Sequence, residues 1–173
     1  SHNTLILFCD ILDAVKKNSY DRDPRGIAKK AEAYLKSTKI GDKVFFGPEP
    51  EFFVFDDVRY KNDMNETSFS IDSIEGPYNT GKKYQNGNMG HRPGIKGGYF
   101  PVPPVDSAQD MRGEYLKGLR DVGIKVEKHH HEVAPSQHEL GMYFGTLVEQ
   151  ADNVQLYKYV VHMVTHSFGK TAT

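Results

Sequence analysis

The stretch Glu127–Glu139 constrains the fold of this chain more than any other, because it predicts two strands joined by a tight turn. Ile124–Val133 has the composition of a strand, Pro135-Ser136 turns the chain, and Glu139–Phe144 returns as a second strand. Strands linked by short turns favour an antiparallel or mixed sheet. The stretch is also dense in carboxylates and imidazoles, which a hairpin brings within several ångströms of one another.

The rest of the chain alternates between predicted helices and strands. Helices are expected at residues 24–37, with Asp23 as the cap, at 107–122, capped by Asp106 or Ser107, and at 147–168. Strands are expected at residues 4–12 and at 44–56, with a break at Gly47-Pro48, and a hairpin at 60–75 precedes a long loop at 78–98. The pattern predicts an α+β fold in which an antiparallel or mixed β-sheet is backed by helices.

Composition narrows the class of protein. The 173 residues carry a net charge of −1, with 38% hydrophobic and 26% charged residues, as expected for one soluble globular domain. This balance predicts no nucleic-acid partner and no membrane partner. Cys9 is the single cysteine, which excludes an internal disulfide and favours the cytoplasm. Because an initial methionine and a terminal tail are missing, we expect a piece of a longer chain.

Glutamates are the first candidates for chemistry. Glu49 and Glu51 share one face of an expected strand, and Glu132 and Glu139 lie on adjacent strands of the hairpin. Magnesium and manganese prefer oxygen ligands of this kind. A solvated strand face is the alternative, but flanking phenylalanines predict partial burial, and a cation would relieve the repulsion between buried carboxylates. These phenylalanines are Phe45, Phe46, Phe52 and Phe53.

The three histidines alternate between the two faces of their strand. His129 and His131 share one side, and His130 lies on the side of Glu132. Their spacing is not a zinc signature, so structural roles compete with a role in a site. No phosphate-binding loop or Gly-x-Gly-x-x-Gly fingerprint is present, so any nucleotide must be held in another way.

Several long motifs resemble bacterial type I glutamine synthetase, over essentially the whole chain and in the same order. They are Gly47–Phe53 (GPEPEFF), Lys96–Asp110 (KGGYFPVPPVDSAQD), His129–Ala134 (HHHEVA), Gln155–His162 (QLYKYVVH) and Phe168–Thr173 (FGKTAT). The resemblance implies that residues 1–173 are the front half of a catalytic domain. The small N-terminal β-grasp-like domain and the second half of the catalytic domain would be absent, so the chain alone is expected to be inactive.

The resemblance implies two sites for Mg²⁺ or Mn²⁺. Glu51, Glu132 and Glu139 are similar to the three glutamates of the metal site beside the substrate glutamate and ammonia. Glu49 is similar to a ligand of the second metal, which lies against the phosphates of ATP.

Other positions are implied to contact the substrates. Gly47, Glu127 and Phe144 resemble nucleotide contacts, Tyr99 resembles a residue lining the ammonium site, and His130 resembles a residue near the transferred phosphate. Tyr99 and His130 are therefore the expected catalytic residues.

The implied reaction is the ATP-dependent ligation of ammonia to the glutamate side chain through a γ-glutamyl phosphate. Glutamate, ammonium and ATP are the expected small-molecule substrates, and a cytoplasmic homo-oligomer, a dodecamer, is the expected assembly. Three alternatives share parts of the pattern: a related γ-glutamyl ligase that uses another amine, a non-catalytic structural relative and a plain metal-binding module. The match through Tyr99 favours ammonia, and the four glutamates argue against a relative that has lost its metal site.

Overall fold

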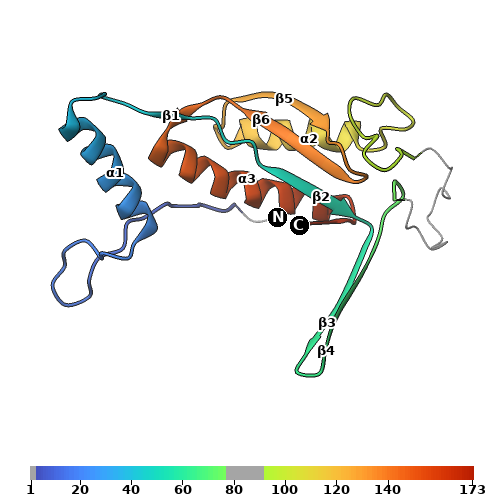
Figure 1. Ribbon diagram of the computed structural model, residues 1–173, viewed down its shortest axis with the longest axis horizontal. Coiled ribbons are helices and arrows are strands. Elements are labelled where there is room, and N and C mark those ends of the chain that lie inside the picture. Colours follow the sequence, from blue (N-terminus) through green and yellow to red (C-terminus); the bar gives the residue numbers. More distant parts are fainter. Residues whose placement is uncertain (1–2, 77–91) are drawn as a thin grey trace. The chain divides into compact units, whose positions relative to one another are not determined.

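The computed structural model describes residues 3–76 and 92–173 (Figure 1). Its helices are α1 (Pro24–Thr38), α2 (Gln109–Asp121) and α3 (Leu147–Ser167). Its strands are β1 (Phe45–Phe46), β2 (Glu51–Phe55), β3 (Asp57–Asp63), β4 (Glu66–Asp72), β5 (Val126–His131), β6 (Gln137–Met142), β7 (Gly145–Thr146) and β8 (Thr171–Ala172). The chain divides into two compact units, Ser1–Pro48 with Phe144–Gln155 and Glu49–Tyr143 with Leu156–Thr173, and each is described by itself.

Helix α1 begins in the first unit where the sequence predicts. The Asp23 side chain accepts hydrogen bonds from the backbone N–H groups of Arg25 and Gly26, and Pro24 occupies the first turn. The helix ends at Lys39, whose φ of 60° is left-handed. No residue of α1 is buried, so the apolar side chains along one face of this helix are not part of a core. These are Ile27, Ala31, Tyr34 and Leu35.

The strand predicted for residues 4–12 is wrong. The segment is irregular and exposed apart from an isolated bridge between Leu12 and Ser19. Arg25 and Lys29 of α1 bind the carboxylate of Asp10. A strand requires a hydrogen-bonded neighbour, and among residues 3–76 and 92–173 no strand ladder forms with this segment. Its β-branched composition therefore does not determine its conformation.

The break predicted at Gly47-Pro48 is confirmed, because β1 and β2 are separate strands. In the first unit, β1 pairs antiparallel with β7, with Phe45 opposite Thr146. The rings of Phe45 and Phe144 meet edge to face at 5.4 Å. The first turns of α3 join this unit through an ion pair between Asp152 and Arg25.

The second unit is built on a four-stranded sheet of order β5-β6-β2-β8, antiparallel at every pairing. Its core face carries Phe52 and Val54 of β2, as the alternation predicts. The Phe52 ring meets Tyr115 of α2 at 5.4 Å and Tyr157 of α3 at 6.1 Å. Helices therefore cover this face, and the opposite face is left for polar side chains. Further buried core residues are Met111, Leu119, Leu140, Met142, Val160 and Val161.

Helix α2 begins at Gln109, two residues later than predicted. Its N-cap is Ala108, whose methyl side chain cannot accept a hydrogen bond. The carboxylate of the expected cap Asp106 instead binds Arg112 and the backbone N–H of Ala108. Ser107 instead donates to a buried carboxylate described below. The helix ends at Asp121, close to the end predicted at residue 122, and the following Gly123 has a left-handed φ of 90°.

A β-hairpin of β3 and β4 confirms the one expected near residues 60–75, and it extends from the end of β2 (Figure 1). The long loop expected at 78–98 falls largely on residues 77–91, which lie outside the described part of the chain; residues 92–98 lie in no helix or strand. None of the described helices is long and apolar enough to cross a membrane.

Candidate metal centre

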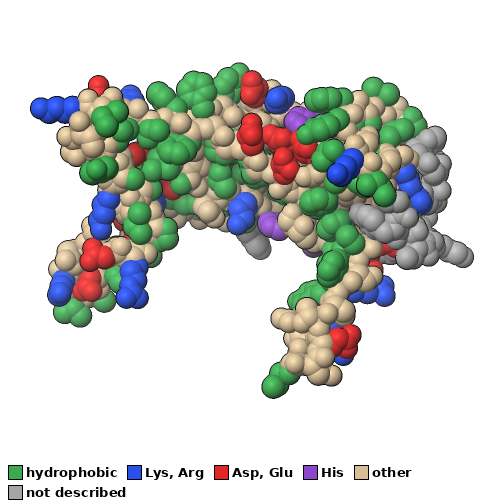
Figure 2. Space-filling model, viewed as in Figure 1, with side chains coloured by type: hydrophobic (Ala, Val, Ile, Leu, Met, Phe, Trp, Pro, Cys, Tyr) green, Lys and Arg blue, Asp and Glu red, His purple; other side chains and the backbone are tan. Residues whose placement is uncertain are grey.

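A row of polar side chains crosses three neighbouring strands of the second unit. Glu51 of β2 lies directly opposite Glu139 of β6, and Glu139 lies opposite His130 of β5. Side chains on paired positions of adjacent strands project to the same face, here the face turned away from α2 and α3. Figure 2 shows acidic side chains gathered over β2 and β6 on this face.

Glu132 completes the group from just beyond the end of β5. Its backbone N–H donates to the carbonyl of Gln137 at 2.8 Å, which closes the turn between β5 and β6. His130 lies between two carboxylates: its Nδ1 is 3.6 Å from Glu132 Oε1 and its Nε2 is 3.4 Å from Glu139 Oε2. One ligand atom from each of His130, Glu132 and Glu139 lies within 4.8 Å of the others. This spacing suits a shared cation.

The electrostatics of the group favour a cation. Burial raises the pKa of Glu139; the nearby His130 opposes this, and a hydrogen bond with Glu132 together with the charges of Glu132 and Glu51 raises it further. A carboxylate with a raised pKa is held at a cost in its charged form. A divalent cation among these oxygens would remove that cost, and carboxylates with one imidazole are ligands that manganese accepts and magnesium partly shares.

Glu51 is exposed and is not a member of the group that the ligand atoms of His130, Glu132 and Glu139 form. The side-chain NH2 group of Gln137 donates to Glu51 Oε2 at 2.5 Å, and the side-chain oxygen of Gln137 accepts from the backbone N–H of Ala134 at 3.0 Å. This role of Gln137 was not predicted from the sequence, where its only signal is its position two residues from Glu139. Glu49 lies in the irregular stretch between β1 and β2, with an exposed side chain outside the group of His130, Glu132 and Glu139.

Tyr99 reaches the same carboxylates from the segment before α2. A hydrogen bond to Glu132 raises the pKa of its exposed phenol, and the charges of the neighbouring glutamates add to the effect. The next residue, Phe100, packs its ring 5.5 Å from His130. Gly98 donates its backbone N–H to the carbonyl of Val133 at 3.0 Å, which seats this segment against the turn. The structure therefore brings Tyr99 to the predicted metal ligands.

The three expected nucleotide contacts fall in both units. Within the first unit, an ideal Cβ on Gly47 would lie 3.9 Å from Phe144 Cβ, so these two positions are neighbours. Phe144 is exposed beside Phe45. In the second unit, Glu127 is an exposed residue of β5.

His129 and His131 face the other side of the sheet, as the alternation predicts. His129 Nδ1 accepts from the guanidinium of Arg112 at 3.2 Å, and His131 Nε2 lies 2.7 Å from a carboxylate oxygen of Glu75. Arg112 also contacts the buried His138, whose pKa burial lowers to about 3. These contacts support a structural role for His129 and His131. Neither Glu75 nor Arg112 was expected from the sequence, since a charged residue carries no local signal of its burial.

The sequence of residues 21–173 matches the family model described as "Glutamine synthetase, catalytic domain". The chain belongs to the glutamine synthetase catalytic-domain family. The family expected from the motifs is therefore confirmed, as is the α+β class.

Relatives of this glutamine synthetase domain align along its whole length. The chain is 62% identical over 173 residues to a glutamine synthetase of Rhizobium meliloti (strain 1021) and 57% identical over 172 residues to one of Salmonella typhimurium (strain LT2). These alignments cover 100% and 99% of the chain, and in both cases it spans 37% of the relative's length.

Two solved structures share the fold. The Plasmodium falciparum glutamine synthetase solved by cryo-electron microscopy superposes with a TM-score of 0.80 at 30% identity, over 93% of this chain and 32% of that one. A structure titled "GmaS/ADP complex-Conformation 1" superposes with a TM-score of 0.62 at 18% identity, over 91% of this chain and 30% of that one. At that identity the second structure supports the fold alone.

Proposed function

We propose that this chain supplies part of the active site of a cytoplasmic, homo-oligomeric glutamate–ammonia ligase that uses ATP. Membership of the family supports the reaction class. The observation that carries the proposal is that ligand atoms of Glu132 and Glu139 approach within 4.8 Å of each other beside His130. Glu51 lies directly opposite Glu139 on the paired strand. Glu132 is not part of a solvated strand face, because its side chain is only 5% exposed.

Glu51, Glu132 and Glu139 would hold one Mg²⁺ or Mn²⁺, and Glu49 would contribute to a second. Their oxygen atoms fit these cations, and the raised pKa of Glu139 indicates a site that gains from positive charge. When bound, the cations would neutralise charge on the transferring phosphoryl group and hold the reactants in line. Gln137 would keep the Glu51 carboxylate in its orientation.

In the proposed reaction, a γ-carboxylate oxygen of glutamate attacks the γ-phosphorus of ATP, and the bond from that phosphorus to ADP breaks. Ammonia then attacks the acyl carbon of γ-glutamyl phosphate, phosphate leaves, and the nitrogen loses a proton. Tyr99 would line the ammonium site, since its phenol lies within hydrogen-bond reach of the carboxylate cluster. The negative charge of that cluster would favour ammonium and help to remove its proton. His130 would contact the transferred phosphate, and Gly47, Glu127 and Phe144 would contact the nucleotide.

The test uses the complete gene product that carries this chain. We expect it to form glutamine from ATP, glutamate and ammonium. Glu132→Gln should lower the rate at least about 100-fold, because it removes a charge from the reacting site. It should also weaken Mn²⁺ binding about tenfold or more, since ligand charge sets cation affinity.

Glu114→Gln is the matched control, because Glu114 is an exposed residue of α2 that pairs with Lys117 on the surface. This variant should behave as the wild type in both measurements. The proposal fails if the wild-type protein releases no phosphate with all three substrates. A strong preference for methylamine over ammonium would favour the related amine ligase instead.

A further inference from the structure

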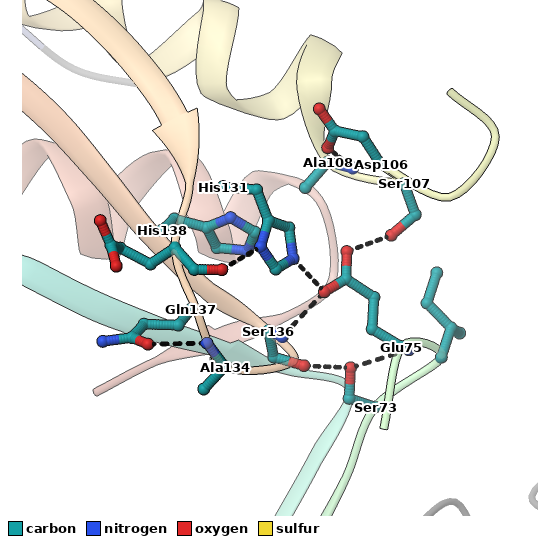
Figure 3. Close-up of polar contacts among 12 residues, drawn as sticks. Ser73, Glu75, Asp106, Ser107, Ala108, His131, Ala134, Ser136, Gln137 and His138 are labelled. Atoms are coloured by element: carbon teal, nitrogen blue, oxygen red, sulfur yellow. Dashed lines mark hydrogen bonds and ion pairs between the residues drawn. The ribbon is translucent and has the colours of Figure 1, made fainter. Parts of the chain in front are cut away.

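A buried carboxylate lies behind the candidate metal centre, on the helix side of the sheet. Glu75 is 3% exposed and follows the β3–β4 hairpin. Its Oε2 accepts from His131 Nε2 and from the backbone N–H of Ser136, each at 2.7 Å, and its Oε1 accepts from the Ser107 hydroxyl at 2.7 Å (Figure 3). Burial raises the pKa of this carboxyl, but hydrogen bonds and the charge of His131 outweigh that effect and lower it to about 2.

His131 connects Glu75 to the backbone of Glu132. Its Nδ1 lies 2.6 Å from the carbonyl oxygen of Glu132, while its Nε2 faces Glu75. A carbonyl and a carboxylate only accept hydrogen bonds, so both ring nitrogens donate. The imidazole therefore bridges Glu75 to the peptide that carries one of the proposed metal ligands.

Ser136 gives Glu75 a second connection to the same turn. Ser136 has a left-handed φ of 67°, which a residue other than glycine seldom adopts. The Glu75 carboxylate accepts a hydrogen bond from the backbone N–H of Ser136, and the Ser136 hydroxyl lies 2.5 Å from the hydroxyl of Ser73. This turn joins Glu132 to the strand of Glu139, so its conformation sets how the two carboxylates meet.

The segment that carries Tyr99 is seated on the same peptide. An ideal Cβ on Gly98 would lie 2.2 Å from the Glu132 carbonyl oxygen and 2.8 Å from the His131 ring. Only glycine fits between them, so a shift of the ring or of the carbonyl would displace Tyr99 together with Glu132.

We propose that Glu75 is a positioning residue of the metal centre, which acts through His131 and Ser136 to hold Glu132, Glu139 and the Gly98 segment in their binding geometry. This inference rests on the proposed function, because it assumes that the carboxylates hold a cation. Groups that orient metal ligands in this way commonly change metal affinity by about 10- to 100-fold when they are removed.

The test measures Mn²⁺ affinity of the complete gene product by electron paramagnetic resonance, with the thermal midpoint recorded without metal. Glu75→Gln keeps the shape of the side chain but removes its charge and replaces one accepting oxygen with a donating NH2 group. We expect Mn²⁺ to bind about tenfold or more weakly. Glutamine formation should recover at saturating Mn²⁺, which loss of folded protein would not produce.

Asp106→Asn is the matched control. Asp106 is also buried on the helix side, and its carboxylate binds Arg112 and the backbone N–H of Ala108. This variant should lower the thermal midpoint yet leave Mn²⁺ affinity within about twofold of the wild type, because the hydrogen bonds of the Asp106 carboxylate go to Arg112 and Ala108 and reach neither Glu75 nor His131. Equal losses of Mn²⁺ affinity in both variants would show a general effect of destabilisation and overturn the proposal.

Ser107→Ala keeps the proposal testable if Glu75→Gln does not fold. It removes one hydrogen bond to Glu75, and we expect about threefold weaker Mn²⁺ binding. If folded Glu75→Gln or folded Ser107→Ala binds Mn²⁺ as tightly as the wild type, while Glu51→Ala binds it more weakly, the positioning role of Glu75 is overturned and the proposed function is not. A wild-type protein that binds no Mn²⁺ would overturn the proposed function as well.

Discussion

Glu139→Gln should make the metal-free protein more stable while it weakens the metal site. The ligand atoms of Glu139 and Glu132 lie within 4.8 Å of each other. Two like charges at that distance repel by about 3 kcal/mol at an effective dielectric constant near 20. This repulsion is reduced by the solvent around the partly exposed Glu139 and by the neighbouring His130. We therefore expect the substitution to raise the free energy of unfolding by about 1 kcal/mol.

The stability difference between Glu139→Gln and the wild type should increase as the pH rises. The pKa of Glu139 is raised in the folded protein, so its contribution to stability is present below the ordinary carboxyl pKa of about 4.3 and is lost as pH rises through the raised value. The glutamine side chain of the variant is neutral throughout. The variant should therefore exceed the wild type in stability at pH 8 and match it near pH 4.

Thermal unfolding of the complete gene product in EDTA measures this difference, which corresponds to a midpoint shift on the order of 2 °C. Mn²⁺ affinity, measured on the same samples, should fall about tenfold. Glu114→Gln, at an exposed site, should change neither quantity. A variant less stable than the wild type at pH 8 without metal would refute the argument from repulsion, and unchanged Mn²⁺ affinity would refute the assignment of Glu139 as a ligand.

Two further predictions concern the folds of the separate units. Leu140→Ala removes a fully buried side chain between the sheet and its helices, and it should lower the free energy of unfolding by about 3 kcal/mol in urea titrations; a loss below about 1 kcal/mol would mean that the site is not a packed core. Asp23→Ala removes the cap of α1 and should cost about 1 kcal/mol, seen as faster amide exchange in the first turn of that helix, whereas Asp23→Asn should retain most of the protection.

Much of the local structure follows from the sequence. The cap and first turn of α1, the break before β2 and the end of α2 near residue 122 depend on neighbours along the chain. Each is found where it was predicted, to within a residue. The alternation of a strand separates His130 from His129 and His131 in the same way. These features are readable because glycine, proline and capping residues act over a few residues.

The strand expected at residues 4–12 shows where such reasoning ends. Its composition suits a buried strand, but its side chains are exposed and the described residues form no ladder with it. Strand propensity reflects packing against neighbours more than an intrinsic preference of the backbone. Local composition therefore cannot decide whether a strand forms.

The sequence by itself determined the candidate ligands, because residue type and spacing are enough to identify the carboxylates of Glu-Pro-Glu and of the histidine-rich hairpin. Only the tertiary structure decided that β2 pairs with β6, which places Glu51 opposite Glu139 from a distant part of the chain. It also decided that Glu75 is buried against His131, beyond the reach of any local pattern. Pairing between distant strands and burial of a charge both depend on partners that the whole fold supplies. For this physical reason, neither could be predicted from the local sequence.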